Sequence, residues 1–166
     1  MSPIVPITTA RLRIRALADA DLDAVYAIVG DETVTAGATW FQPDLDSCRA
    51  YLARRIANEA ELGFSLWGVE RLEEGDLIGL AGYFPHEDEL ELGYALRADC
   101  WGRGYATEAA LAVLDASRPL GRSVYATIRS TNARSLSVAE KIGLAPTGET
   151  IVDERGTKLV FRWPPP

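Results

Sequence analysis

The chain has 166 residues, of which 48% are hydrophobic and 25% are charged, a mixture that fits one ordinary globular domain spanning residues 1–166. No run approaches the roughly 18 consecutive apolar residues of a membrane-spanning helix, so no membrane partner is expected. The formal net charge of −7 argues against a nucleic-acid partner, which needs a basic surface, and fits better with a cationic partner such as an amine.

The N-terminal segment, MSPIVPITTARLRIR, lacks the basic-then-apolar order of a secretory signal, so we expect a cytoplasmic protein. The alternation in 11-RLRIRAL-17 predicts a first strand. Asp19 or Asp21 is expected to cap a helix that runs to about Val29. The Gly, Thr and Pro content of 30-GDETVTAGATWFQP-43 then predicts a loop.

The rest of the chain alternates between helical and extended patterns. A second helix is predicted from Asp44 or Asp46 to Gly63, because apolar residues recur there at helical spacing. Three strands follow, the first two joined by a turn at 73–76, over 64–72, 77–84 and 90–96. A helix, a strand, a helix and a final hairpin complete the order, over 105–117, 122–130, 133–142, 147–153 and 157–163.

This order predicts a mixed α/β fold with too few alternating βα units for a doubly wound sheet. The strands at 90–96 and 122–130 flank a helix, so they should be parallel neighbours. The closing prolines at 164–166 are expected to fray.

The stretch 100-CWGRGYATEA-109 carries the clearest chemical signal. A helix N-terminus presents unpaired N–H groups and a partial positive charge, and Gly102 and Gly104 would let an anion approach that backbone. Arg103 adds a cation, so a pyrophosphate is the expected ligand. The alternative is a glycine turn that binds nothing. No Lys-Ser or Lys-Thr follows as in a Walker loop, and Thr107 replaces the third glycine of a Rossmann fingerprint.

The cysteines give a weaker signal. Cys48 and Cys100 form no CxxC motif, which argues against a metal site and a disulfide framework. Cys100 lies beside the glycines and is a conceivable nucleophile, but His86 is the only histidine available to activate it. A small apolar filler is the simpler interpretation of Cys100.

The stretch 91-ELGYALRADCWGRGYATEAA-110 resembles the acetyl-CoA-binding segment of the GNAT N-acetyltransferase superfamily, in particular its Rim-like, ribosomal-protein-alanine branch. Trp101 replaces the Arg or Gln that opens the family's phosphate-loop pattern. The segments 11-RLRIRAL-17 and 132-NARSLSVAEKIGL-144 resemble two further family signatures. The resemblance implies a GNAT fold of about seven strands and four helices, in which the parallel strands 90–96 and 122–130 splay apart.

The resemblance also implies acetyl-CoA as co-substrate, with no metal. Its pyrophosphate would bind the loop and helix start at Gly102, Arg103, Gly104, Tyr105, Ala106 and Thr107. Its pantetheine arm would pair along the strand near Leu96 and Ala98, where a backbone N–H near Leu96 polarises the thioester carbonyl. Asn132 would contact the same arm, although its simpler role is a helix N-cap.

Two residues are candidates for proton transfer. Ser135 lies where the Rim-like branch carries a serine proposed to protonate the thiolate, and its alternative is an ordinary surface serine. The helix at 133–142 lacks the Tyr that many GNAT enzymes use for this step. Glu91 is the first candidate for the base, because a partly buried carboxylate among apolar residues has a raised pKa. An ion-pair role for Glu91, Glu154 as base, or a relay of water are the alternatives.

The acceptor site is expected between the loop at 30–43 and the last hairpin. Trp40 and Phe41 would stack on the acceptor there, or simply pack the loop onto the core. Glu154, with Asp153 and Glu89, would attract an amine. The expected acceptor is a small amine or a protein N-terminus. A non-catalytic acyl-CoA sensor and a nucleotide-binding domain are the rival functions, and a homodimer is an expectation from the family alone.

Overall fold

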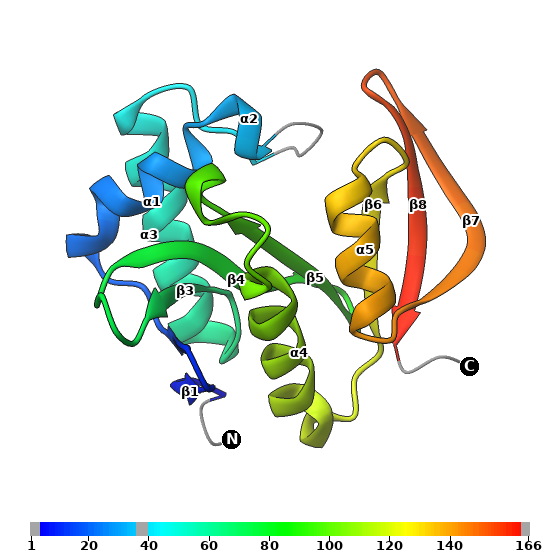
Figure 1. Ribbon diagram of the computed structural model, residues 1–166, viewed down its shortest axis with the longest axis horizontal. Coiled ribbons are helices and arrows are strands. Elements are labelled where there is room, and N and C mark those ends of the chain that lie inside the picture. Colours follow the sequence, from blue (N-terminus) through cyan, green and yellow to red (C-terminus); the bar gives the residue numbers. More distant parts are fainter. Residues whose placement is uncertain (1–3, 36–39, 164–166) are drawn as a thin grey trace.

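The computed structural model describes residues 4–35 and 40–163, and its strands form one mixed sheet in the order β1-β2-β3-β4-β5-β6-β8-β7 (Figure 1). The eight strands are β1 (Ile7–Thr8), β2 (Leu12–Arg15), β3 (Leu66–Arg71), β4 (Leu77–His86), β5 (Glu89–Leu96), β6 (Val124–Arg129), β7 (Ala145–Asp153) and β8 (Gly156–Trp163). All neighbours are antiparallel except β5 and β6, which are parallel as predicted.

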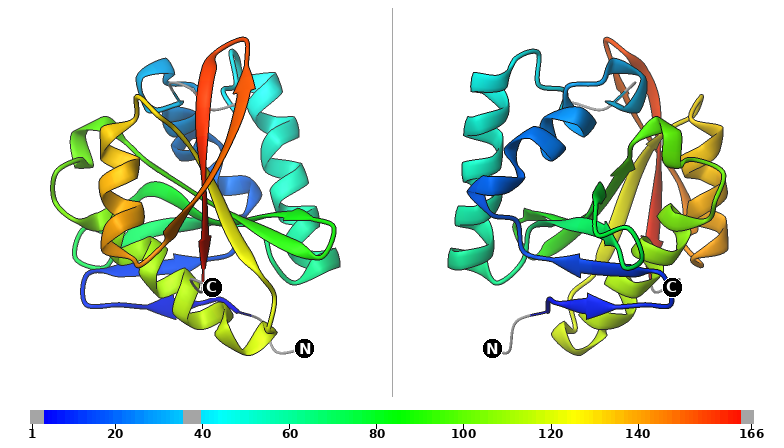
Figure 2. Two further views of the ribbon diagram at one scale, coloured as in Figure 1. Left: turned by 90° about the vertical axis from the view of Figure 1, so that its right-hand side faces the viewer. Right: turned by 60° about the vertical axis from the view of Figure 1, so that its left-hand side comes forward.

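Helices cover both faces of the sheet. The α-helices are α1 (Leu22–Val29), α2 (Glu32–Thr35), α3 (Leu45–Leu62), α4 (Tyr105–Ser117) and α5 (Ala133–Lys141). Three short 3₁₀ turns are η1 (Asp19–Asp21), η2 (Ala98–Cys100) and η3 (Arg118–Leu120). The side views in Figure 2 show α1 and α3 on one side of the sheet and α4 and α5 on the other. Across the described residues, no helix has the length and hydropathy that would carry it through a bilayer.

The counts of seven strands and four helices were too low. The added strand β1 has only two residues, too few for a readable alternation. The added helix α2 lies inside the predicted loop at 30–43, of which 36–39 fall outside the described residues, as does the predicted frayed tail. The signal for α2 was Asp31, whose carboxylate accepts the N–H of Thr33 at 2.8 Å, as an N-cap does.

The predicted helix caps were partly correct. Asp44 caps α3 by accepting the N–H of Ser47 at 2.7 Å, and Gly63 ends that helix with a left-handed φ of 76°. Asp21 precedes α1 but does not cap it with its side chain. Its carboxylate instead binds both outer nitrogens of Arg15, six residues earlier in the chain, at 2.9 Å.

The parallel strands β5 and β6 separate soon after they begin. Their register contains only the pairs Leu90 with Val124 and Glu91 with Tyr125. Beyond Glu91 the described strands have no paired residues, and Figure 1 shows them diverging toward their C-terminal ends, as the expected splay requires. The facing backbone edges of β5 and β6 therefore have no strand partner beyond Glu91, although both strands lie in the middle of the sheet.

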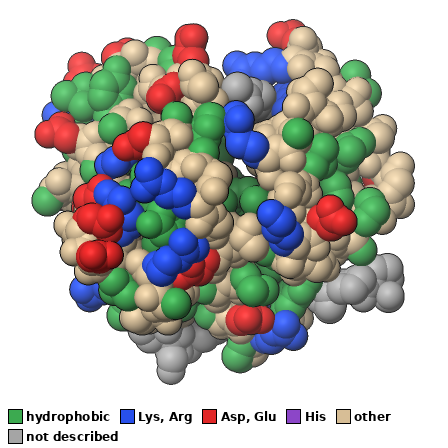
Figure 3. Space-filling view, viewed as in Figure 1, with side chains coloured by type: hydrophobic (Ala, Val, Ile, Leu, Met, Phe, Trp, Pro, Cys, Tyr) green, Lys and Arg blue, Asp and Glu red, His purple; other side chains and the backbone are tan. Residues whose placement is uncertain are grey.

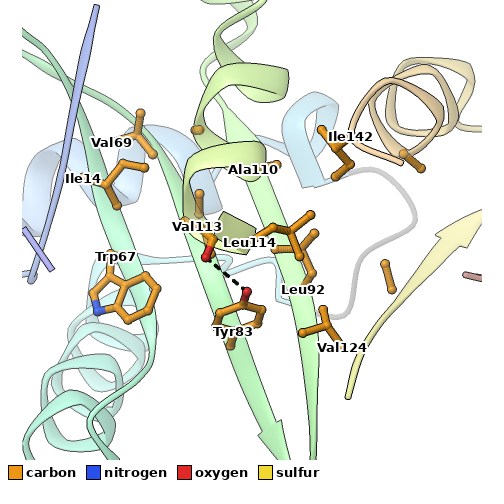
Figure 4. Close-up of a cluster of buried hydrophobic side chains, with 14 of the residues drawn as sticks. Ile14, Trp67, Val69, Tyr83, Leu92, Ala110, Val113, Leu114, Val124 and Ile142 are labelled. Atoms are coloured by element: carbon orange, nitrogen blue, oxygen red, sulfur yellow. Dashed lines mark hydrogen bonds between the residues drawn. The ribbon is translucent and has the colours of Figure 1, made fainter. Parts of the chain in front are cut away.

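Side-chain alternation assigns the two faces of the sheet different roles. Leu90, Leu92 and Leu96 point into a core that includes residues of α4 and α5. Figure 4 shows part of this core, where the hydroxyl of Tyr83 donates to the carbonyl oxygen of Val113 at 3.3 Å. Phe84 and Ala95 pack instead against the core that includes residues of α1 and α3. The splay therefore opens toward both layers of helices.

Candidate active site

A cavity of about 1170 Å³ lies at the splay, and Figure 3 shows a hollow in the middle of the visible face with Lys and Arg side chains near its rim. Its walls come from β5, the loop before α4, β6 with α5, the β7–β8 hairpin and the segment around α2. Of the predicted site residues, the cavity is lined by Trp40, Phe41, Glu91, Leu96, Gly102, Gly104, Tyr105, Ala106, Thr107, Asn132 and Ser135.

Three predicted residues are not among the described residues that line this cavity. Ala98 is exposed in η2, and Arg103 is exposed in the glycine loop. Glu154 is exposed in the two-residue turn between β7 and β8. The side chains of Arg103 and Glu154 are thus not part of the described lining, whereas the contacts expected at Ala98 and along the Gly102–Thr107 loop involve the backbone.

The glycine loop forms a cradle at the N-terminus of α4. Gly102 and Gly104 have φ values of 72° and 79°, a region that L side chains rarely adopt. The first N–H to bond back along the helix is that of Glu108, to the oxygen of Gly104 at 3.0 Å. The preceding N–H groups, from Tyr105 to Thr107, have no intrahelical acceptor and add to the positive end of the helix dipole. This arrangement suits an anion.

Arg11, which sequence analysis did not assign to the site, holds this loop in place. Its Nη1 donates to the carbonyl oxygen of Arg103 at 2.9 Å, and its guanidinium lies 4.4 Å from the centre of the Tyr105 ring. Its Nε and backbone N–H donate to the carboxylate of Glu108 at 2.7 and 2.9 Å. Thr9 donates to the same carboxylate at 2.6 Å. The turn between β1 and β2 therefore holds the loop before α4 and the first turn of that helix.

Trp101 connects the end of β5 to the cofactor loop. Its indole N–H donates to the carbonyl oxygen of Leu96 at 2.9 Å, and the guanidinium of Arg134 lies 3.8 Å from its ring centre. This side chain stands where the GNAT pattern has Arg or Gln. Where the family has Arg at this position, its positive charge is absent here, and Arg134 of α5 provides a cation beside the loop instead.

The backbone of β5 offers donors on the open side of the splay. The N–H of Leu90 points toward β6, since it donates to the oxygen of Ser123 at 3.0 Å. Alternate residues of a strand share that direction, so the N–H groups of Tyr94 and Leu96 also point away from β4. The carbonyl oxygen of Leu96 already accepts a hydrogen bond from Trp101, whereas the N–H of Leu96 can donate to a ligand.

Asn132 and Ser135 lie on the opposite wall, at the start of α5. The side-chain oxygen of Asn132 accepts the N–H of Ser135 at 3.1 Å, which makes it the N-cap of α5. A contact from Asn132 to a ligand would therefore use its amide nitrogen. Tyr94 reaches across from β5, and its hydroxyl donates to the carbonyl oxygen of Ser135 at 3.1 Å. Burial raises the pKa of Tyr94, so its phenol stays protonated.

Glu91 faces the side of the sheet opposite to α4 and α5. It is opposite Phe84 in the register of β4 and β5, so the two side chains share a face. Its carboxylate accepts a hydrogen bond from the hydroxyl of Thr127 in β6 at 2.7 Å. Burial, followed by the nearby Glu91 and Glu89 carboxylates, raises the pKa of Tyr125 to about 12. A carboxylate thus lies at the closed end of the splay, next to a neutral phenol.

The aromatic residues expected at the acceptor site line the cavity, and Trp40 also packs against the core. The Trp40 ring meets Phe84 edge-on with 5.8 Å between centres, and both border the core beneath α1 and α3. Trp40, Phe41 and Phe84 also line the cavity. The two interpretations of Trp40 are therefore compatible, because one side of its ring can pack while another borders the cavity.

The acids expected to attract an amine are engaged elsewhere. Asp153 binds Arg129 through both oxygens at 2.7 and 2.8 Å, and hydrogen bonds from Arg129 lower the pKa of Asp153 to about 2. Glu89 pairs with Arg162 at the start of β5. Neither acid is among the described residues that line the cavity, so the expectation that they draw in an amine is not supported.

Cys100 is 2% exposed, and burial raises the pKa of its thiol, so it is not poised as a nucleophile. The hydrophobic-filler interpretation suits its position. Within residues 4–35 and 40–163, no group of three or more His, Cys, Asp or Glu side chains has the arrangement to hold a metal ion.

Comparison with known proteins decides the family. Residues 11–145 match the model of the acetyltransferase (GNAT) domain. The chain belongs to the GNAT acetyltransferase family. Among curated proteins, this GNAT chain is 31% identical over 151 residues to the uncharacterized protein YkkB of Bacillus subtilis, and the match covers 87% of each.

Solved structures agree with this assignment. An acetyltransferase from Agrobacterium tumefaciens is 32% identical, with a TM-score of 0.77, and the alignment covers 96% of this chain and 94% of the other. RimL, a ribosomal-protein α-N-acetyltransferase solved in complex with coenzyme A, has a TM-score of 0.82 at 15% identity, and 97% of each chain is covered. At that identity the likeness to RimL shows the fold. Membership in the family makes the chain an acyl-CoA-dependent acetyltransferase.

The residues present fit acetyl-CoA. Gly102 leaves open space around its α-carbon, with no heavy atom within 4 Å of the point where a β-carbon would stand, and Gly104 meets only the end of the Arg11 side chain at 3.4 Å. The N–H groups that follow suit a diphosphate, and the open edge of β5 suits an amide-containing arm. Each of these features is a property of this chain's own backbone.

Proposed function

We propose that the protein transfers the acetyl group of acetyl-CoA to a primary amine, on a small molecule or a protein N-terminus, by direct transfer in a ternary complex. One observation carries the proposal. The backbone cradle at the start of α4 and the carboxylate of Glu91 line one cavity, although they belong to opposite faces of a sheet that is split between them.

The cofactor side of the cavity would hold acetyl-CoA through backbone groups. The N–H groups from Gly102 to Thr107 bind the diphosphate, and the open edge of β5 at Tyr94 and Leu96 pairs with the pantetheine arm. The amide nitrogen of Asn132 donates to the same arm. When bound, acetyl-CoA supplies an acetyl group already activated as a thioester.

The residues at the splay would then handle one negative charge and two protons. The N–H of Leu96 donates to the carbonyl oxygen, where negative charge develops during attack. The Glu91 carboxylate, oriented by Thr127, accepts a proton from the amine. Ser135 supplies a proton to the departing thiolate, and the protonated phenol of Tyr94 is the second candidate because it lies against the same turn of α5.

An eight-stranded sheet that spans nearly the whole described chain supports a single acetyltransferase domain over residues 1–166, which we place in the cytoplasm. One rival function expected from the sequence was a non-catalytic acyl-CoA sensor. Such a sensor needs the cradle but not a carboxylate at the closed end of the splay, so the Glu91–Thr127 pair favours the enzyme.

Glu91→Gln tests the proposal. We expect the turnover number to fall about 100-fold, the lower end of the effect of a general base, with acetyl-CoA affinity unchanged. Glu89→Gln is the matched control, since Glu89 lies on the same strand and face but pairs with Arg162. The assay is thiol release across N-terminal peptides, polyamines and aminoglycosides. Full turnover by Glu91→Gln at every pH would remove Glu91 as the base, and acetyl-CoA binding without thiol release from any amine would favour the sensor.

A further inference from the structure

The charge of the cavity is opposite to that of the protein. The chain carries a net charge of −7, yet the charged residues among the described lining are five cations and two acids: Arg129, Arg134, Lys141, Arg155 and Lys158 against Glu32 and Glu91. An acidic protein that gathers cations around one cavity has a site for negatively charged groups.

The phosphates of acetyl-CoA account for only part of this set. Arg134 and Lys141 belong to α5, and Arg134 stacks on Trp101 beside the glycine cradle. These two cations are therefore on the cofactor side. The other three come from the end of β6, the β7–β8 turn and β8.

Arg129 and Lys158 face the opposite side of the sheet from α5. They are register partners in β6 and β8, so their side chains share a face. The preceding pair in the ladder, Ile128 and Leu159, packs into the core that includes α4 and α5. Alternation then directs Arg129 and Lys158 to the face that carries Glu91 and Thr127. That face is the acceptor side of the proposed reaction.

Lys158 is only loosely neutralised. Asp153 gives both carboxylate oxygens to Arg129, at 2.7 and 2.8 Å, while the Nζ of Lys158 lies 3.8 Å from one of them. The side chain of Arg129 is 6% exposed and that of Lys158 is 20% exposed. Glu154, four residues before Lys158, is exposed in the β7–β8 turn and is not among the described residues that line the cavity. One carboxylate is therefore shared by two cations, and Lys158 is the one that retains room for a ligand.

The spacing between these groups defines what fits. Thr127 binds Glu91, and Arg129 lies two residues further along β6, a rise of about 6.6 Å. Lys158 is opposite Arg129 on β8, about 4.8 Å across, so its α-carbon stands about 8 Å from that of Thr127. An amine that gives its proton to Glu91 would thus place a group some 5–8 Å away beside Lys158.

We infer that the acceptor is an amine that carries an acidic group, a carboxylate or phosphate, about 5–8 Å from its nitrogen, and that Lys158 selects it. A polyamine or aminoglycoside would bring a second cation to Lys158 and be rejected. A peptide with an acidic second residue and a small amino acid of similar reach share this chemistry. The inference deepens the proposed acetyl transfer and rests on it.

Two matched sets of acceptors test this selection and separate its sources. The peptide amides Ala-Asp-Ala-Ala, Ala-Asn-Ala-Ala and Ala-Lys-Ala-Ala differ only at the second residue, and 4-aminobutanoate and 1,4-diaminobutane differ only at the far group. Thiol release gives kcat/KM for each. We expect the acidic member of at least one set to exceed the basic member at least tenfold, with a ratio that falls as salt rises.

Lys158→Glu and the milder Lys158→Gln assign the effect to this residue. Both are expected to reduce the acidic-to-basic ratio at least tenfold, Lys158→Glu inverting it, while the KM for acetyl-CoA stays unchanged. Lys141→Glu, a charge reversal on the cofactor side, is the matched control: it is expected to raise the KM for acetyl-CoA and keep the ratio. Preference for the basic acceptors, or a ratio that survives in folded Lys158→Gln, would overturn the inference.

A binding measurement keeps the two proposals apart. Calorimetric titration of the coenzyme A-bound protein with the unreacted peptides reports acid preference without catalysis. If no acceptor of either set is acetylated, the proposed transfer fails, and equal binding of the Asp and Lys peptides then also overturns the acidic acceptor. Tighter binding of the Asp peptide that is lost in Lys158→Gln supports it.

Discussion

Arg11 offers a sharp test of how the cofactor cradle is held, because it touches the loop from outside the cavity. Replacing it with Gln removes the ion pair to Glu108, the hydrogen bond to the Arg103 carbonyl and the stacking on Tyr105. Its side chain is 45% exposed, so the ion pair contributes about 0.2–1 kcal/mol. The stacking adds about 0.5–1 kcal/mol, and the hydrogen bond a similar amount.

These contributions overlap, so the total loss is about 1–2 kcal/mol, which corresponds to roughly a 5- to 30-fold weaker affinity for acetyl-CoA if the loop must reorder on binding. Calorimetric titration with acetyl-CoA measures the dissociation constant, and saturating substrate should restore most of the turnover. Arg13→Gln, two residues along and exposed, is the control. A melting temperature that falls while the acetyl-CoA affinity stays within twofold would show that Arg11 only joins β2 to α4.

Three further predictions follow from the same geometry. Gly104→Val should raise the KM for acetyl-CoA tenfold or more, because a left-handed β-branched residue adds about 1–2 kcal/mol of strain and a side chain at the phosphate; Gly121→Val, at a φ of 62° after η3, carries the same strain and should leave that KM unchanged. Arg129 lowers the pKa of Asp153 to about 2 from an ordinary 3.8, so this carboxylate stabilises the fold fully above about pH 4 and loses that effect as the pH falls toward 2. Urea unfolding should therefore show Asp153→Asn to be destabilising at pH 7, with a gap from the native protein that narrows below pH 4; a constant gap would contradict the ion pair. Arg55 is buried and, among the described residues, its Nε and Nη1 have no hydrogen-bond partner. Arg55→Leu should therefore raise the free energy of unfolding by about 1 kcal/mol, after subtraction of the lost stacking on Tyr51 and Phe84. A clear decrease in the free energy of unfolding would show that the surroundings stabilise this buried cation.

Local patterns in the sequence determined the elements whose ends are made by neighbouring residues. Asp44 and Gly63 bound α3, Asn132 caps α5, and the glycines at 102 and 104 open α4, all as the sequence predicted. Each of these signals depends on hydrogen bonds or φ angles within one turn, which the residue types alone specify. The resemblance carried by the same segments also pointed to the family that the comparison establishes.

The tertiary structure decided which charges meet. Arg11 pairs with Glu108, which is 97 residues away in the sequence. Arg129 pairs with Asp153, which is 24 residues away, so this carboxylate is not available to an acceptor. The sequence predicted that Asp153, Glu154 and Glu89 would attract an amine, whereas the register of β6 with β8 brings Lys158 beside Arg129 at the cavity. Strand alternation fixes only that neighbouring residues face opposite ways. Which of the two sets of side chains borders the cavity depends on the register with the partner strand, and the packing of the whole sheet sets that register.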